Sequence, residues 1–97
     1  MIILLGNATL QPGRQDEALA LSQQHVWRSR TEPGCLSHAV YLDPEDPLCL
    51  VFVERWSDRA ALQVHFELDA SRQFIAALSG LLSAAPQMQI YESEPAG

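Results

Sequence analysis

The chain has 97 residues, 47% apolar and 19% charged, a composition typical of one globular domain rather than a disordered segment. Six Lys and Arg residues against twelve Asp and Glu residues give a net charge of −6 without a basic cluster, which argues against nucleic acid and anionic membranes as partners. The apolar start MIILLGNATL is too short for a signal peptide and no run has the length of a membrane helix, so we expect a soluble, cytoplasmic protein.

The first half of the chain predicts a strand, a helix and a hairpin. Residues 2–10 have the composition of a strand, which Pro12-Gly13 ends, and a helix is expected from about residue 13 to residue 29. Its apolar stripe is formed by Ala18, Leu19, Ser22 and Val26. After the turn residues 32–34, residues 35–42 predict a second strand and residues 43–47 a hairpin loop.

The second half predicts a strand, two helices and a last strand. The third strand spans residues 48–56, and Ser57 or Asp58 is expected to cap a short helix that ends near Glu67. Asp69 is expected to cap a further helix over residues 70–82, and residues 87–92 predict the fourth strand. The end of the chain, from about residue 92, is expected to fray. The order βαββααβ predicts one α+β domain over residues 1–97, a ferredoxin-like fold with a four-stranded antiparallel sheet.

The third predicted strand is apolar on both faces. Leu50 and Phe52 share one face, and Val51 and Val53 share the other. A sheet covered by helices on one side only should alternate apolar and polar residues more cleanly. We therefore expect a homodimer in which two sheets pack face to face.

The two cysteines are not expected to form a disulfide. If residues 43–47 are the hairpin loop, opposed residue numbers sum to about 90, which places Cys49 opposite Tyr41 and Cys35 near Arg55. That separation is too long for a disulfide, so we expect two reduced thiols.

Residues 33–66 carry a recognisable series of short motifs. The series consists of Pro33-Gly34-Cys35-Leu36, Tyr41-Leu42-Asp43-Pro44, Glu54-Arg55-Trp56 and Ala61-Leu62 followed by His65. In this series the chain resembles the antibiotic biosynthesis monooxygenase family. The resemblance implies a dimeric α+β barrel with a pocket between sheet and helices. The family includes cofactor-free monooxygenases acting on quinols and anthrones, haem-degrading enzymes and members without known activity.

Phe52, Glu54 and Trp56 share one face of the third strand, which the resemblance turns toward the pocket. The indole of Trp56 offers a flat wall and one N–H donor for a planar aromatic substrate that carries an oxygen. Glu54 is a candidate proton acceptor. In the alternative interpretation, Trp56 closes the end of the core and Glu54 accepts a local hydrogen bond.

Asn7 is a polar residue in the otherwise mostly apolar first strand and is expected beside the pocket. It resembles the asparagine of haem-degrading members and is a second candidate donor to a substrate oxyanion; the alternative is a strand amide satisfied near Gly6. The resemblance to haem-degrading members ends at the iron ligand, because the positions nearest to their axial histidine are Ile75 and Ala76.

The histidines and the remaining aromatic residues complete the candidate site. The resemblance places His65 where members often have a histidine, as a candidate base or donor, with helix capping or a loop hydrogen bond as the alternative. His38 is a candidate substrate-binding residue on the second strand, and Phe74 an apolar wall beside Phe52. His25 is expected to be a surface or packing residue of the first helix.

No metal and no cofactor are expected. Cys35 and His38 have C-x-x-H spacing, but residues i and i+3 of a strand point to opposite faces and cannot hold one ion. The resemblance, together with the pattern of pocket-facing residues, implies a cofactor-free monooxygenase that oxidises a quinol- or anthrone-like aromatic with dioxygen. The alternatives are a non-catalytic dimer that binds a small aromatic molecule and a haem-degrading enzyme.

Overall fold

The computed structural model describes residues 1–97 and has seven regular elements. They are, in chain order, β1 (Ile2–Thr9), α1 (Gln15–Ser29), β2 (Cys35–Asp43), β3 (Asp46–Trp56), α2 (Arg59–Glu67), α3 (Asp69–Ser79) and β4 (Gln87–Glu92). The strands form one antiparallel sheet in the order β2-β3-β1-β4. The predicted ferredoxin-like α+β fold is therefore confirmed.

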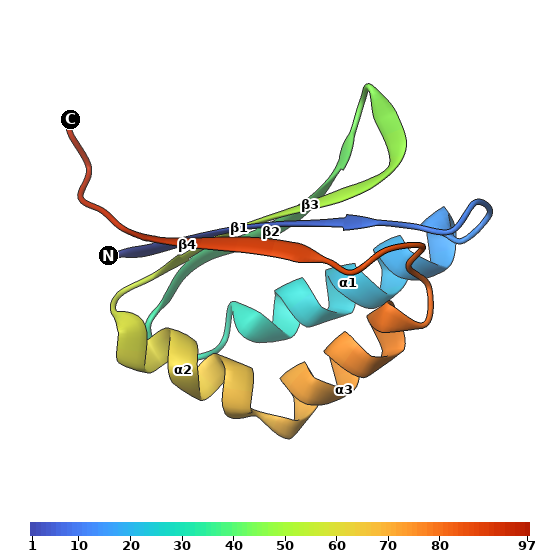
Figure 1. Cartoon of the computed structure of the whole chain (residues 1–97). Coiled ribbons are helices and arrows are strands. Elements are labelled where there is room, and N and C mark those ends of the chain that lie inside the picture. The colour runs from blue at the N-terminus through green and yellow to red at the C-terminus, as the bar shows by residue number, and fades with distance from the viewer.

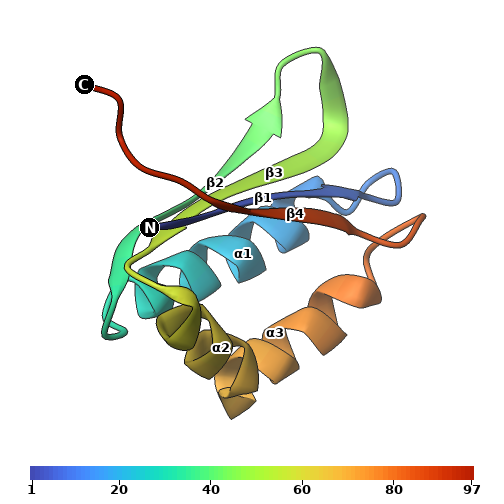
Figure 2. The ribbon, with the colours of Figure 1, turned by 60° about the vertical axis from the view of Figure 1, so that its left-hand side comes forward.

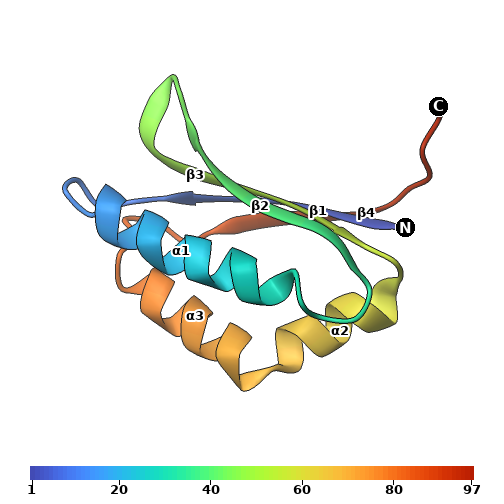
Figure 3. The ribbon, with the colours of Figure 1, turned by 180° about the vertical axis from the view of Figure 1, so that it is seen from behind.

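The sheet and the helices form two layers. All three helices lie on the same side of the sheet, and the tip of the β2–β3 hairpin bends away from them (Figure 1). Turning the molecule shows α1 and α3 running beside each other, with α2 at one end of the layer (Figures 2 and 3). No helix is long and apolar enough to cross a membrane.

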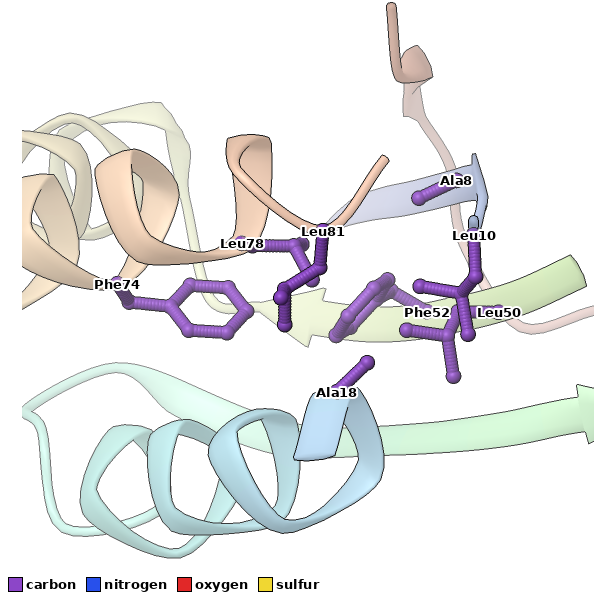
Figure 4. Packing of buried hydrophobic residues seen from close by; sticks show 8 residues of the cluster. All are labelled: Ala8, Leu10, Ala18, Leu50, Phe52, Phe74, Leu78 and Leu81. Atoms are coloured by element: carbon purple, nitrogen blue, oxygen red, sulfur yellow. The ribbon is translucent and has the colours of Figure 1, made fainter. Parts of the chain in front are cut away.

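The core lies between the two layers. The inward face of β3 carries Leu50 and Phe52, which pack with Ala8 of β1 and Ala18 of α1. Phe74 and Leu78 of α3 point into the same layer from the helix side (Figure 4). A second, smaller cluster of Ile2, Leu4, Trp56 and Leu62 fills the space next to α2.

The helix ends show which local predictions are right. Asp58 caps α2 as expected, because its carboxylate accepts a hydrogen bond from the Ala61 amide at 2.8 Å. Asp69 is the first residue of α3 rather than its cap, and the cap position belongs to Leu68, which has no side-chain oxygen.

The α3 helix ends at Ser79 because the chain turns at Gly80, and Leu82 instead bridges to Leu10. The α1 helix begins at Gln15, two residues late, because Gly13 adopts a φ of 85°.

The hairpin register differs from the prediction. The pairing lies two residues from the predicted one, so Tyr41 pairs with Val51, and a bulge or irregularity separates Leu42 from Asp43. A second irregularity between Cys35 and Ser37 places Cys35 opposite Trp56. A shift of two residues keeps every side chain on its predicted face, so the assignment of faces is unaffected. Cys35 and Cys49 are free thiols.

Candidate active site

A cavity of about 550 Å³ lies between the sheet and the helix layer. Phe52 of β3 and Phe74 of α3 lie on its two sides, with ring centroids 6.1 Å apart in an edge-to-face arrangement. The other lining residues of α3 are half apolar and half polar: Ile75, Ala76, Leu78, Ser71, Arg72 and Ser79. A cavity of this volume with an apolar lining and a few polar groups is typical of a small-molecule site.

His65 of α2 and Glu32, which precedes β2, form a hydrogen-bonded pair at this cavity. His65 lines the cavity, is 3% exposed and has its Nδ1 atom 2.9 Å from a carboxylate oxygen of Glu32. A carboxylate oxygen only accepts, so Nδ1 carries the proton and the lone pair of a neutral ring is on Nε2. This arrangement fixes the ring and gives it one defined acceptor atom.

Glu54 and Trp56 form a second buried pair on the inward face of β3. The indole N–H of Trp56 donates to Oε1 of Glu54 at 3.0 Å. Glu54 lines the cavity, whereas Trp56 does not and is completely buried in the smaller core cluster. The structure therefore brings Glu54 to the cavity and places Trp56 behind it, with the indole donor already in use.

His38 of β2 faces Glu54 across the sheet and is 1% exposed. Its Nε2 atom lies 3.2 Å from Oε1 of Glu54, at an orientation that does not make a hydrogen bond, and neither ring nitrogen has a hydrogen-bond partner. His38 does not line the cavity itself. An unpartnered polar ring in the interior is costly, so His38 stands out among the buried residues.

His25 of α1 completes a cluster of three buried histidines and is a packing residue rather than a surface residue. Its ring is 5% exposed, lines the cavity and stacks on Phe74 at 3.9 Å between centroids, with 6° between the ring planes. Burial lowers the pKa of His25 from 6.5 to about 3, and the two other histidines and Arg28 act in the same direction. The guanidinium of Arg28 donates to Nδ1 at 2.6 Å, so the single proton of the neutral ring is on Nε2.

Asn7 lies at the rim of the cavity, where β1 pairs with Gln87 of β4. Strand alternation puts its side chain on the face opposite to Gly6 and Ala8, and the residue is exposed. The structure thus brings Phe52, Phe74, Glu54 and His65 together around one space and leaves Asn7 at its edge.

Sequence reasoning missed two residues of this site, His25 and Glu32. The helical spacing that includes Ala18 and Ser22 continues through His25 to Ser29, so the inward position of His25 was readable from the period. Glu32 belongs to a turn, and only the packing of α2 against that turn brings it to His65.

Comparisons with known proteins agree with this fold. The family model of antibiotic biosynthesis monooxygenases matches residues 1–77. An uncharacterized protein of Synechocystis, sll1783, is 35% identical over 91 residues, which are 94% of this chain. This chain spans only 62% of the length of that protein. A candidate monooxygenase of Bacillus subtilis, YcnE, is 31% identical over 84 residues, which cover 87% of this chain and 88% of that protein.

Solved structures show the same similarity. The crystal structure of an antibiotic biosynthesis monooxygenase superimposes with a TM-score of 0.90 at 26% identity, covering 98% of this chain and all of that one. A candidate antibiotic biosynthesis monooxygenase of Deinococcus radiodurans gives a TM-score of 0.93 at 26% identity, covering 99% of this chain and 95% of that one. The family model and the relatives lead to one conclusion: the chain belongs to the antibiotic biosynthesis monooxygenase family.

Proposed function

We propose that this chain is a cofactor-independent monooxygenase that oxidises a quinol- or anthrone-like aromatic with dioxygen in the cavity between sheet and helices. The observation that carries the proposal is the Glu32–His65 pair at the wall of an apolar cavity. The cavity suits a flat apolar guest, and the histidine supplies one oriented proton acceptor.

Dioxygen reacts slowly with closed-shell organic molecules, so the substrate must first become electron-rich. In an anthrone, Nε2 of His65 removes a proton from the ring methylene and leaves a stabilised carbanion. The carbanion transfers electrons to dioxygen, and a C–O bond forms. The imidazolium of His65 returns its proton to the peroxide. The second methylene hydrogen then leaves as a proton, the O–O bond breaks, and the departing hydroxide combines with that proton as water. The methylene becomes a carbonyl, and one substrate molecule plus one O₂ gives one ketone plus one water. The substrate supplies all four electrons, so the reaction needs no external reductant.

The other site residues support this step. Phe52 and Phe74 are proposed as apolar walls that hold the aromatic plane and exclude water. Trp56 is proposed to fix Glu54 through its indole hydrogen bond. Asn7 is left out of this step, because strand alternation turns its amide to the outer face of the sheet, away from the cavity.

We also propose that the protein is a homodimer in which the outer faces of two sheets pack against each other. The outer face carries Ile3 and Leu5 of β1 and Val51 and Val53 of β3, and Leu5 is 40% exposed in the single chain. An apolar sheet face of this kind is commonly covered by a second sheet.

Oxygen uptake with a panel of quinols and anthrones tests the function. Chelator-treated protein should consume oxygen above the autoxidation rate, and His65→Gln should lower kcat by about 10²-fold or more, because the general base is lost. Glu32→Gln should lower kcat with little change in KM, because the ring loses its orientation but the cavity is unchanged. Val64→Ala, an exposed change on the same helix, is the matched control and should behave as the original protein.

The outcomes separate the proposal from its rivals. Uptake that is equal in His65→Gln and the original protein would contradict a role for His65 in catalysis. Tight binding of an aromatic without turnover would instead indicate a non-catalytic binding dimer. A Soret band on titration with haem would indicate a haem-binding member.

A further inference from the structure

We propose that His25, His38 and His65 together bind one divalent transition-metal ion of the zinc or copper class beside the cavity. Each ring offers one nitrogen, and these three nitrogens lie within 4.8 Å of one another. The rings come from α1, β2 and α2, and all three are buried. This inference does not depend on the proposed oxidation, because metal binding is measured without substrate.

His38 supplies the second, independent observation. Both of its ring nitrogens are buried without a hydrogen-bond partner. A polar group left unpaired in the interior costs free energy, so some ligand is expected there. A bound metal ion would accept the lone pair of one nitrogen and remove this cost.

The charges around the cluster suit a dication. Glu32 accepts from Nδ1 of His65, which is the carboxylate–histidine arrangement found behind many metal-binding histidines. Oε1 of Glu54 lies 3.2 Å from Nε2 of His38, close enough to act as a counter-charge or to join the ligand set. Two carboxylates beside three neutral imidazoles balance the charge of one divalent ion.

Arg28 opposes metal binding by His25, because its guanidinium donates to Nδ1 of that ring at 2.6 Å. While Arg28 donates to Nδ1, the ring proton occupies Nε2, the nitrogen that remains for an ion. The ion must therefore move this proton to Nδ1 and displace the guanidinium. Replacing Arg28 should therefore strengthen metal binding, because the three histidines remain and the competing guanidinium is gone.

The distances require a small closure of the cluster. Nitrogens bound to one tetrahedral zinc ion lie about 3.4 Å apart, given Zn–N bonds of about 2.0–2.1 Å. The widest separation, up to 4.8 Å, must shrink by about 1.4 Å, which rotations of the imidazole rings can provide. An all-imidazole donor set favours zinc, copper, nickel or cobalt over magnesium or calcium.

The ion and the proposed general base compete for the same atom. A metal bound to Nε2 of His65 removes the lone pair that would accept the substrate proton. Because His25 and His65 line the cavity, the open coordination position faces the space for the substrate. Zinc should therefore inhibit any metal-free oxidation.

Equilibrium dialysis of the chelator-treated full chain against zinc chloride, followed by elemental analysis, tests the proposal. One zinc ion per chain is expected, and His38→Gln should weaken binding at least tenfold, in the range seen when a metal site loses one of its supporting groups. Arg28→Met should tighten binding. Replacing both cysteines with serine is the matched control and should leave the affinity unchanged, because thiols are the other common zinc ligands in the chain.

The three histidines of the site are the only histidines in the chain. Every imidazole ¹⁵N resonance therefore belongs to the cluster, and all three rings should shift on addition of zinc. This measurement decides the question even if His38→Gln fails to fold. Unshifted imidazole resonances, or equal zinc binding by a folded His38→Gln, would overturn the proposal, whereas the oxygen-uptake assay on chelator-treated protein tests the oxidation separately.

Discussion

At the scale of single residues, the chain places a neutral imidazole against the face of a phenyl ring. His25 stacks on Phe74 at 3.9 Å and is shielded from water. In the unfolded chain this ring binds a proton below a pH of about 6.5, whereas in the folded chain it does so only near 3. The unfolded state therefore gains the proton first as the solution becomes acidic, and His25 makes folding less favourable throughout this window.

The substitution His25→Gln tests this linkage. The free energy of unfolding of the original protein should be greatest above pH 6.5 and should fall steadily toward pH 3, and the variant should lose less over the same window because an amide does not titrate. Urea unfolding of the two chelator-treated proteins at a series of pH values measures the difference. An equal loss of unfolding free energy in both proteins would show that His25 is not the cause of the pH dependence, since the two proteins share all other titrating groups.

At the scale of elements, Gly34 sets the distance between the start of β2 and α2. Its φ of 82° is a conformation that favours glycine, and its carbonyl accepts a hydrogen bond from Ser57 at 2.8 Å. A Cβ atom at Gly34 would lie 2.5 Å from the Cβ of Ala61 in α2. The absence of a side chain therefore lets α2 approach the turn closely enough for His65 to reach Glu32.

Gly34→Ala should destabilise the protein by about 2–4 kcal/mol, because it combines backbone strain with a steric clash. Gly13→Ala is the matched control, since Gly13 has a φ of 85° but open space around it, and it should cost about 1 kcal/mol. Denaturant unfolding of both variants gives the comparison. Equal losses of stability in Gly34→Ala and Gly13→Ala would mean that backbone strain, without the clash against Ala61, explains the whole effect at Gly34.

The elements were predictable because each depends on local periodicity. The alternation in β3 gave the correct faces even though the pairing lies two residues from the predicted one. The site was only partly predictable, because its polar contacts join residues distant in sequence. Glu54 and Trp56 were visible as neighbours on one strand face, whereas Glu32 meets His65 only through the packing of a turn against a helix.

At the scale of the whole molecule, the outer face of the sheet should determine the assembly. Leu5 points outward from the centre of the sheet and is 40% exposed, and Tyr41 of β2 is 57% exposed on the same side. An exposed apolar sheet face of this kind is stable in water when another surface covers it. In a single chain this face is exposed to water.

Sedimentation of the original protein should give twice the chain mass of 10.7 kDa. Leu5→Glu should weaken the dimer by at least tenfold, because it buries a carboxylate between two apolar sheets. Val64→Glu introduces the same charge at a residue of α2 that is 55% exposed, and should leave the dimer unchanged. A monomeric original protein would contradict the sheet-to-sheet arrangement.

Besides four residues of β1, the cavity is lined by two different stretches of the chain. The three histidines and both carboxylates beside them fall within residues 25–65, whereas twelve of the twenty lining residues fall within residues 66–88. One stretch thus holds the acid–base groups and the other mostly gives the space its shape. Natural variation in α3 and the following turn can alter the contour of the cavity while the histidines stay in place. This division predicts that substitutions in α3 change which molecules the cavity admits while the three histidines keep their positions.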